Sequence, residues 1–143
     1  MIVVDTTVLV YAVGSDHPYR DPCRALVEAI SQGDVRATTT IEVVQEFAYV
    51  RARRRRRDDA VQLASSFADL LAPLTPARET HLRAGLELWR RHSESGCFDA
   101  VLVAVARELA ASTIVSADRA FGTAQGVGHT IPDEAGVAAL LAT

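Results

Sequence analysis

Short runs of β-branched apolar residues alternate along this chain with longer segments whose apolar positions repeat at helical spacing. The runs 2–4 and 113–116 are predicted as buried strands, and segments 36–38, 73–76 and 129–131 are weaker strand candidates. The predicted helices cover residues 22–30, 40–57, 58–71, 77–92, 99–111 and 133–141. Because helices between short apolar strands form βαβ units, the pattern predicts an α/β fold with a parallel sheet.

Acidic residues stand at the ends of these apolar elements. Asp5 follows the first strand, Asp118 lies two residues after the second predicted strand, and Asp99 opens the very apolar segment 100–106. Each acid alone is explained as a turn or helix-cap residue. Jointly they occupy the edge where open α/β sheets bind ligands, and capping does not require that coincidence. A cluster of carboxylates repels itself unless a hard cation neutralises it, so the pattern predicts a metal site.

The predicted helix after Thr40 adds two glutamates, Glu42 and Glu46, four residues apart on one face. Thr39 and Glu42 fit a capping box, with Thr39 as the N-cap and Glu42 three residues into the helix. Glu46 has no such structural role, and the apolar periodicity of the helix places it on the solvent side.

Length and composition predict one domain spanning residues 1–143, with enough apolar sequence for a sizeable core. No apolar run reaches the ~20 residues of a membrane span, and no signal-like segment precedes the first strand, so we expect a soluble, cytoplasmic protein. Cys23 and Cys97 lack metal-ligand spacing and are predicted to be small buried residues rather than a disulfide. Leu82, Leu86 and Trp89 share one helix face, which predicts core or interface packing.

The basic residues are unusually distributed for a chain of net charge −3: all fifteen are Arg, and six of them fall within 51–57. The absence of Lys excludes P-loop and Schiff-base chemistry and the lysine that receiver domains use. A run of Arg at a helix end is either a solvated complement to the helix dipole or a contact for RNA phosphates or an acidic partner. Six like charges in seven residues repel one another, which argues against a merely solvated helix end and favours contact with RNA or an acidic partner. The candidate contact residues are Arg51, Arg53, Arg54 and Arg55.

Four segments carry a resemblance to a known family. They are Val4 to Leu9 (VDTTVL), Thr40 to Phe47 (TIEVVQEF), Phe98 to Ala100 with its apolar helix, and Ile114 to Phe121 (IVSADRAF). In this order they span most of the chain, which resembles a PIN domain and, within that family, a VapC-type toxin ribonuclease.

The resemblance implies a three-layer α/β/α sandwich around a short parallel sheet. It places the family's acidic quartet on Asp5, Glu46, Asp99 and Asp118. Thr6 and Ser116 match positions where the family has a hydroxyl near the metal, and Glu42 is left as an outer-shell acid. A set of carboxylates without His or Cys selects Mg²⁺ or Mn²⁺ over Zn²⁺.

The implied function is metal-dependent endonucleolytic cleavage of RNA by a toxin. Such a toxin would be held inactive by a VapB-type antitoxin and would form a homodimer, with tRNA, rRNA or other structured RNA as substrate. Two alternatives stay open: an RNA-processing PIN nuclease without an antitoxin, and a non-catalytic RNA-binding PIN module. Thr7 occupies the position where a dehalogenase-type phosphatase requires a second aspartate, which argues against that class.

Overall fold

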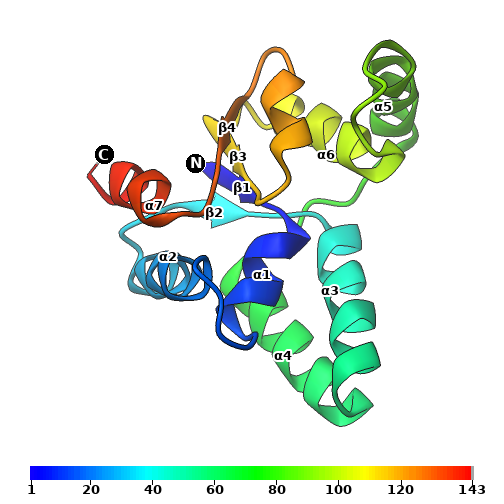
Figure 1. The fold of residues 1–143 in the computed structure, drawn as a ribbon. Coiled ribbons are helices and arrows are strands. Elements are labelled where there is room, and N and C mark those ends of the chain that lie inside the picture. The colour runs from blue at the N-terminus through cyan, green and yellow to red at the C-terminus, as the bar shows by residue number, and fades with distance from the viewer. Residues whose placement is uncertain (143) are drawn as a thin grey trace.

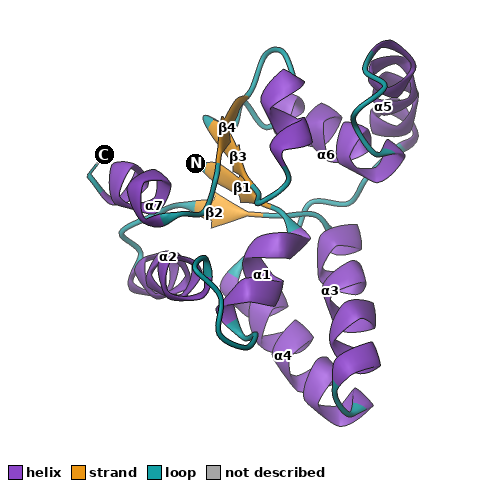
Figure 2. Ribbon diagram, viewed as in Figure 1, coloured by secondary structure: helices purple, strands orange, loops and turns teal. Residues whose placement is uncertain are grey.

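The computed structural model describes residues 1–142, which fold around a four-stranded parallel sheet (Figures 1 and 2). The strands are β1 (Ile2–Val4), β2 (Ala37–Thr38), β3 (Thr113–Val115) and β4 (Gly128–Thr130), in the order β2-β1-β3-β4. All residues of β1 and β3 are buried, so helices cover both faces of the sheet. The predicted α/β sandwich with a short parallel sheet is confirmed.

The helices are α1 (Thr6–Ala12), α2 (Arg20–Gln32), α3 (Ile41–Arg54), α4 (Arg57–Leu70), α5 (Glu79–Arg91), α6 (Cys97–Glu108) and α7 (Glu134–Leu141), with a 3₁₀ helix at Arg119–Thr123. Helix α1 was not predicted. It begins directly after β1 because the carboxylate of Asp5 caps it, accepting from Thr7 N. The predicted strand at 73–76 is wrong, since only an isolated bridge joins Thr40 and Thr75 there.

The start of α3 differs by one residue from the predicted capping box. Thr40 is the N-cap, and its Oγ1 accepts a hydrogen bond from Val43 N at 3.2 Å. Thr39 instead donates its hydroxyl to Val4 O at 2.6 Å, which ties the helix start to the end of β1. Thr39, which local spacing predicted as the N-cap, therefore makes a tertiary contact instead.

Helix α6 starts earlier than predicted, at Cys97 rather than Asp99. Gly96 occupies the N-cap position, so Asp99 lies inside the first turn, and helix capping does not account for it. Helix α5 packs closely on α6 at Gly85, where an added Cβ would lie 2.8 Å from Val101 Cα. This close approach holds α6, the helix that carries Asp99, against α5.

Leu82, Leu86 and Trp89 do not enter the core of this chain, because each is 42–47 % exposed on α5. Both cysteines are free, Cys23 buried and Cys97 partly exposed. Burial raises the pKa of the Cys23 thiol to about 12, as expected for a residue that packs rather than reacts. Among residues 1–142, every helix is too short or too polar to span a bilayer.

Candidate active site

Asp5 is a buried carboxylate at the carboxyl end of β1, only 6 % exposed. Its Oδ2 atom accepts hydrogen bonds from Ser116 Oγ at 2.7 Å and from Thr7 Oγ1 at 2.9 Å. Ser116 lies at the carboxyl end of the neighbouring strand β3, so two adjacent strand ends build this contact. The two hydroxyl donors hold the carboxylate in one orientation.

Glu46 lies on the exposed face of α3, as its periodicity predicted, but it is not free in solvent. Thr6, in the first turn of α1, donates its hydroxyl to Glu46 Oε2 at 2.5 Å. The residue chosen from the family pattern thus faces the carboxyl end of β1. The two predicted hydroxyl residues, Thr6 and Ser116, each hold one member of the acidic quartet.

Asp99 carries the clearest electrostatic sign of a site. Burial, and then the negative charges of Asp5, Asp118 and Glu46, raise the pKa of Asp99 from 3.8 to about 6, against a hydrogen bond from the Gly96 backbone. The charges of Asp5, Asp118 and Glu46 therefore act together on Asp99, although the four acids come from four separate segments of the chain. A carboxylate whose pKa is raised by burial and by neighbouring acids is typical of functional sites.

Asp118, like Glu46, is an exposed member of the quartet. It caps the 3₁₀ helix by accepting from Ala120 N at 2.8 Å, and its own backbone N–H donates to Ser116 Oγ at 3.0 Å. Like Asp5, it therefore has the structural role that its sequence context allowed. Capping and membership of a carboxylate cluster coexist in both residues.

An open groove of about 700 Å³ runs between α3 and the α5–α6 pair and reaches three members of the quartet, Asp5, Glu46 and Asp99. Glu42 also lines this groove. Its Oε1 accepts from Ala77 N at 3.3 Å, whereas its Oε2 is buried and has no hydrogen-bond partner. A buried carboxylate oxygen without a donor suits the neighbourhood of a cation.

The donor set fits a hard divalent cation in its chemistry, because it consists of carboxylates and hydroxyls that already repel or orient one another. Within residues 1–142, however, no three acidic, His or Cys side chains converge closely enough to hold one ion together. Binding would therefore require the carboxylates to move toward one another. The raised pKa of Asp99 reflects the cost of holding a negative charge there, and a bound cation would remove this cost.

The arginine run divides into different roles. Arg51 is engaged: its guanidinium pairs with Asp59 of α4 at 2.5 Å and donates to Val13 O at 3.2 Å. The hydrogen bond from Arg51 lowers the pKa of the Asp59 carboxyl. Arg51 thus joins α3, α4 and the end of α1. A contact of Arg51 with RNA or an antitoxin, as predicted from the sequence, would have to form alongside these structural contacts. The side chains of Arg53, Arg54 and Arg55 are exposed.

Thr7 is the site residue that the sequence did not predict. Besides donating to Asp5, its Oγ1 accepts from Ala117 N at 3.0 Å and lies 3.3 Å from Ser116 Oγ. It therefore connects Asp5 to the segment after β3 that leads to Asp118. The spacing Asp-x-Thr was a usable signal, because a side chain two residues after an Asp is within reach of its carboxylate in an Asx turn.

Known proteins resemble this chain in sequence and in fold. The model of the PIN domain family matches residues 2–126. Ribonuclease VapC7 of Mycobacterium tuberculosis is 49 % identical over 142 residues, which cover 99 % of this chain and 98 % of that protein. The chain belongs to the PIN-domain family and, within it, to the VapC ribonucleases.

Solved structures agree with the fold of this VapC-type chain. VapC20 of Mycobacterium tuberculosis, a sarcin–ricin loop cleaving toxin, matches with a TM-score of 0.75 at 21 % identity, over 89 % of this chain and 97 % of VapC20. FitAB bound to an IR36 DNA fragment contains a chain that matches with a TM-score of 0.73 at 16 % identity, over 92 % and 95 % of the two chains. The predicted PIN-like architecture is confirmed by both.

Proposed function

We propose that this chain is a metal-dependent endoribonuclease whose acidic quartet holds Mg²⁺ or Mn²⁺ against an RNA phosphodiester. The observation that carries the proposal is the position of Asp99, a partly buried carboxyl whose pKa is raised first by burial and then by the charges of the other three acids. Its similarity to ribonuclease VapC7 supports the same activity. A bound divalent cation would lower the pKa of an attacking water and stabilise the leaving oxygen.

The residues of this chain have distinct roles in that proposal. Asp5 and Asp99 are the core cation ligands, and Asp118 and Glu46 complete the set. Thr6 fixes Glu46 through Oε2, which leaves Oε1 available to orient a water or to accept its proton. Ser116 and Thr7 orient Asp5 through Oδ2, so that Oδ1 remains available for the cation.

Metal removal is the first test of this proposal. Total tRNA and rRNA are incubated with the protein in Mg²⁺, in Mn²⁺ and in EDTA, and the RNA ends are mapped. We expect discrete fragments with either metal, none in EDTA, and full recovery when the metal is restored. Asp5→Asn protein, purified in parallel, reports any contaminating nuclease. Cleavage that persists in EDTA, or well-folded protein that cuts no RNA with either metal, would contradict the proposal.

The proposed biological setting is that of a toxin. VapC20 is a toxin, and we propose that this chain likewise acts in the cytoplasm as the toxin of a VapBC-type pair, with one nuclease domain over residues 1–143. A VapB-type antitoxin would block the groove beside the acids. A small antitoxin gene directly upstream would favour this setting, and its absence would favour an RNA-processing nuclease.

We also propose that the chain forms a homodimer through α5. Leu82, Leu86 and Trp89 lie on one side of this helix with nearly half of each side chain exposed, more apolar surface than one monomer helix needs to show. Sedimentation at micromolar concentration is expected to give a dimer, and Leu86→Arg is expected to give a folded monomer. A wild-type protein that sediments as a monomer would contradict the proposed homodimer.

A further inference from the structure

Helices α1 and α3 run side by side in the same direction, and two contacts mark the ends of the seam between them (Figure 1). Near the carboxyl ends of the strands, Thr6 Oγ1 bonds Glu46 Oε2. At the other end, Arg51 donates to Val13 O. From Thr6 to Val13 a helix rises roughly 10 Å, so the seam leads from the acidic quartet to the arginine run over a short distance.

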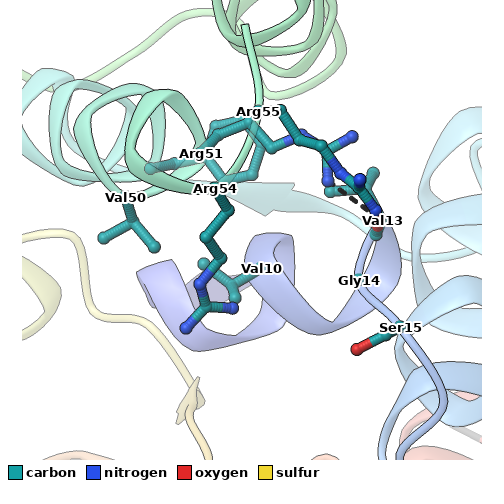
Figure 3. A pocket seen from close by; sticks show the side chains of 9 residues that line it. Val10, Val13, Gly14, Ser15, Val50, Arg51, Arg54 and Arg55 are labelled. Carbon is teal, nitrogen blue, oxygen red and sulfur yellow. Dashed lines mark hydrogen bonds between the residues drawn. The ribbon is translucent and has the colours of Figure 1, made fainter.

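A pocket of about 260 Å³ opens at the arginine end of this seam (Figure 3). Val10, Val13, Phe47 and Val50 contribute its apolar lining. Its polar groups come from Ser15 and from Arg51, Arg54 and Arg55. Figure 3 shows the Arg54 side chain extending from α3 across toward Val10 of α1.

The arginines of this pocket differ in how their charges are used. Arg51 is occupied by Asp59 and by Val13 O, and Arg24 donates to Ala12 O at 2.9 Å. The carbonyl end of α1 therefore already has two guanidinium partners. Within residues 1–142, the guanidinium groups of Arg54 and Arg55 form no hydrogen bond or ion pair, although the charge of Arg55 contributes to the lowered pKa of Asp59, so their donors remain available to a ligand. Capping of α1 does not explain their presence in the pocket.

The ligand should be an anion that the acidic quartet alone would repel. A chain of net charge −3 with four clustered acids disfavours a polyanion at the cutting point, unless a positive site nearby compensates. Guanidinium groups bind phosphate bidentately and serve this purpose well. An RNA strand that places one phosphate at the acids carries further phosphates along the seam, spaced by roughly 3.4 Å of rise if its bases stay stacked.

We propose that Arg54 and Arg55, with Ser15 beside them, bind a backbone phosphate of the RNA substrate about three nucleotides from the bond that is cut. The inference rests on the proposed ribonuclease function and assigns one part of the substrate to a defined pocket. It favours RNA over an acidic protein because the pocket continues the seam from the site that must hold a phosphodiester.

RNA binding in EDTA tests the pocket without requiring cleavage. A fluorescent single-stranded RNA is titrated with the full chain, with Arg54→Gln/Arg55→Gln, and with the matched control Arg56→Gln/Arg57→Gln, whose positions do not line the pocket. The pocket variant is expected to bind about 10-fold more weakly at 0.1 M salt and to lose roughly 0.7 from its log–log salt slope, the share of one phosphate on a single strand. The affinity of the control for RNA is expected to differ from that of wild type by less than about 2-fold. Its log–log salt slope is expected to differ from the wild-type slope by less than about 0.7.

A set of RNAs with a single neutral methylphosphonate then locates the phosphate. Wild type is expected to lose affinity when the neutral group lies about three nucleotides from the mapped cut, and the pocket variant is expected to be insensitive at that same position. The proposal is overturned if both double variants bind RNA alike, or if wild type does not bind RNA. Poly-glutamate is titrated in the same way as a model of an acidic protein. The proposal is also overturned if the pocket variant binds poly-glutamate more weakly than wild type but binds RNA normally, because the pocket would then dock an acidic protein.

The outcomes separate this inference from the proposed function. Wild-type protein that cuts RNA while the pocket variant binds normally would leave the nuclease standing and remove the phosphate pocket. Wild-type protein that binds RNA through the pocket but never cuts would remove the nuclease instead. Circular dichroism melts of each variant confirm that any change in RNA affinity comes from the folded protein.

Discussion

Asp99→Asn is expected to melt at a higher temperature than wild type at pH 7 in EDTA, while metal-dependent cleavage falls about 100-fold or more. The gain arises because burial and the neighbouring acids raise the pKa of Asp99 from 3.8 to about 6, so its charge destabilises the folded state. That difference corresponds to at most about 3 kcal/mol, and the partial exposure of the side chain reduces the expected gain to about 1 kcal/mol.

The pH dependence of this effect has a definite sign. Between about pH 4 and pH 6 the folded protein retains the Asp99 proton that the unfolded chain has lost, so wild-type stability falls as the pH rises. Above pH 6 the penalty is fully present, and below pH 4 it is absent. The stability difference between Asp99→Asn and wild type should therefore be largest near pH 7 and should vanish toward pH 4.

Two variants and one ligand control this measurement. Asp69→Asn removes an exposed acid outside the site and should change neither the melting temperature nor cleavage. Asp5→Asn should lose cleavage without gaining stability, because it weakens two charge-assisted hydrogen bonds at a buried position. Added Mn²⁺ should stabilise wild type but not Asp99→Asn. An Asp99→Asn protein less stable than wild type at pH 7 would contradict a self-repelling cluster.

The sequence predicted most of this fold because apolar periodicity and strand composition are local signals. It missed α1, because seven residues directly after a strand have no room for a recognisable period, and the helix depends on its Asp5 cap. It also misplaced the start of α3 by one residue. Thr39 and Thr40 are equivalent in local spacing, and only the bond from Thr39 to Val4 O distinguishes them.

The candidate site depended on two kinds of information. Asp5, Asp99 and Asp118 could be chosen from their positions beside apolar elements. Glu46 could not, because its periodicity placed it in solvent and only the family pattern selected it. The structure explains this: Glu46 is on the exposed side of α3, yet α1 brings Thr6 to it. That contact depends on the tertiary arrangement of a helix that the sequence did not predict.

Thr7→Val is expected to weaken Mn²⁺ binding about 10- to 100-fold, the usual cost of removing a group that orients a metal ligand. The substitution keeps the shape of the side chain but removes one of the two hydroxyl donors to Asp5 Oδ2. It also leaves the Ala117 N–H without its acceptor. Since Thr7 joins the segments that carry Asp5 and Asp118, both carboxylates lose orientation.

Rescue distinguishes this positioning role from a general loss of stability. Thr7→Ser restores the hydroxyl and should bind Mn²⁺ within a few-fold of wild type, even though it loses the methyl group. Thr80→Val, at an exposed position on α5, is the matched control and should leave Mn²⁺ affinity unchanged. Calorimetric titration of the metal-free protein measures these affinities without any RNA. If Thr7→Ser and Thr7→Val bind Mn²⁺ equally weakly, the hydroxyl does not position Asp5, and the methyl group of Thr7 is what matters.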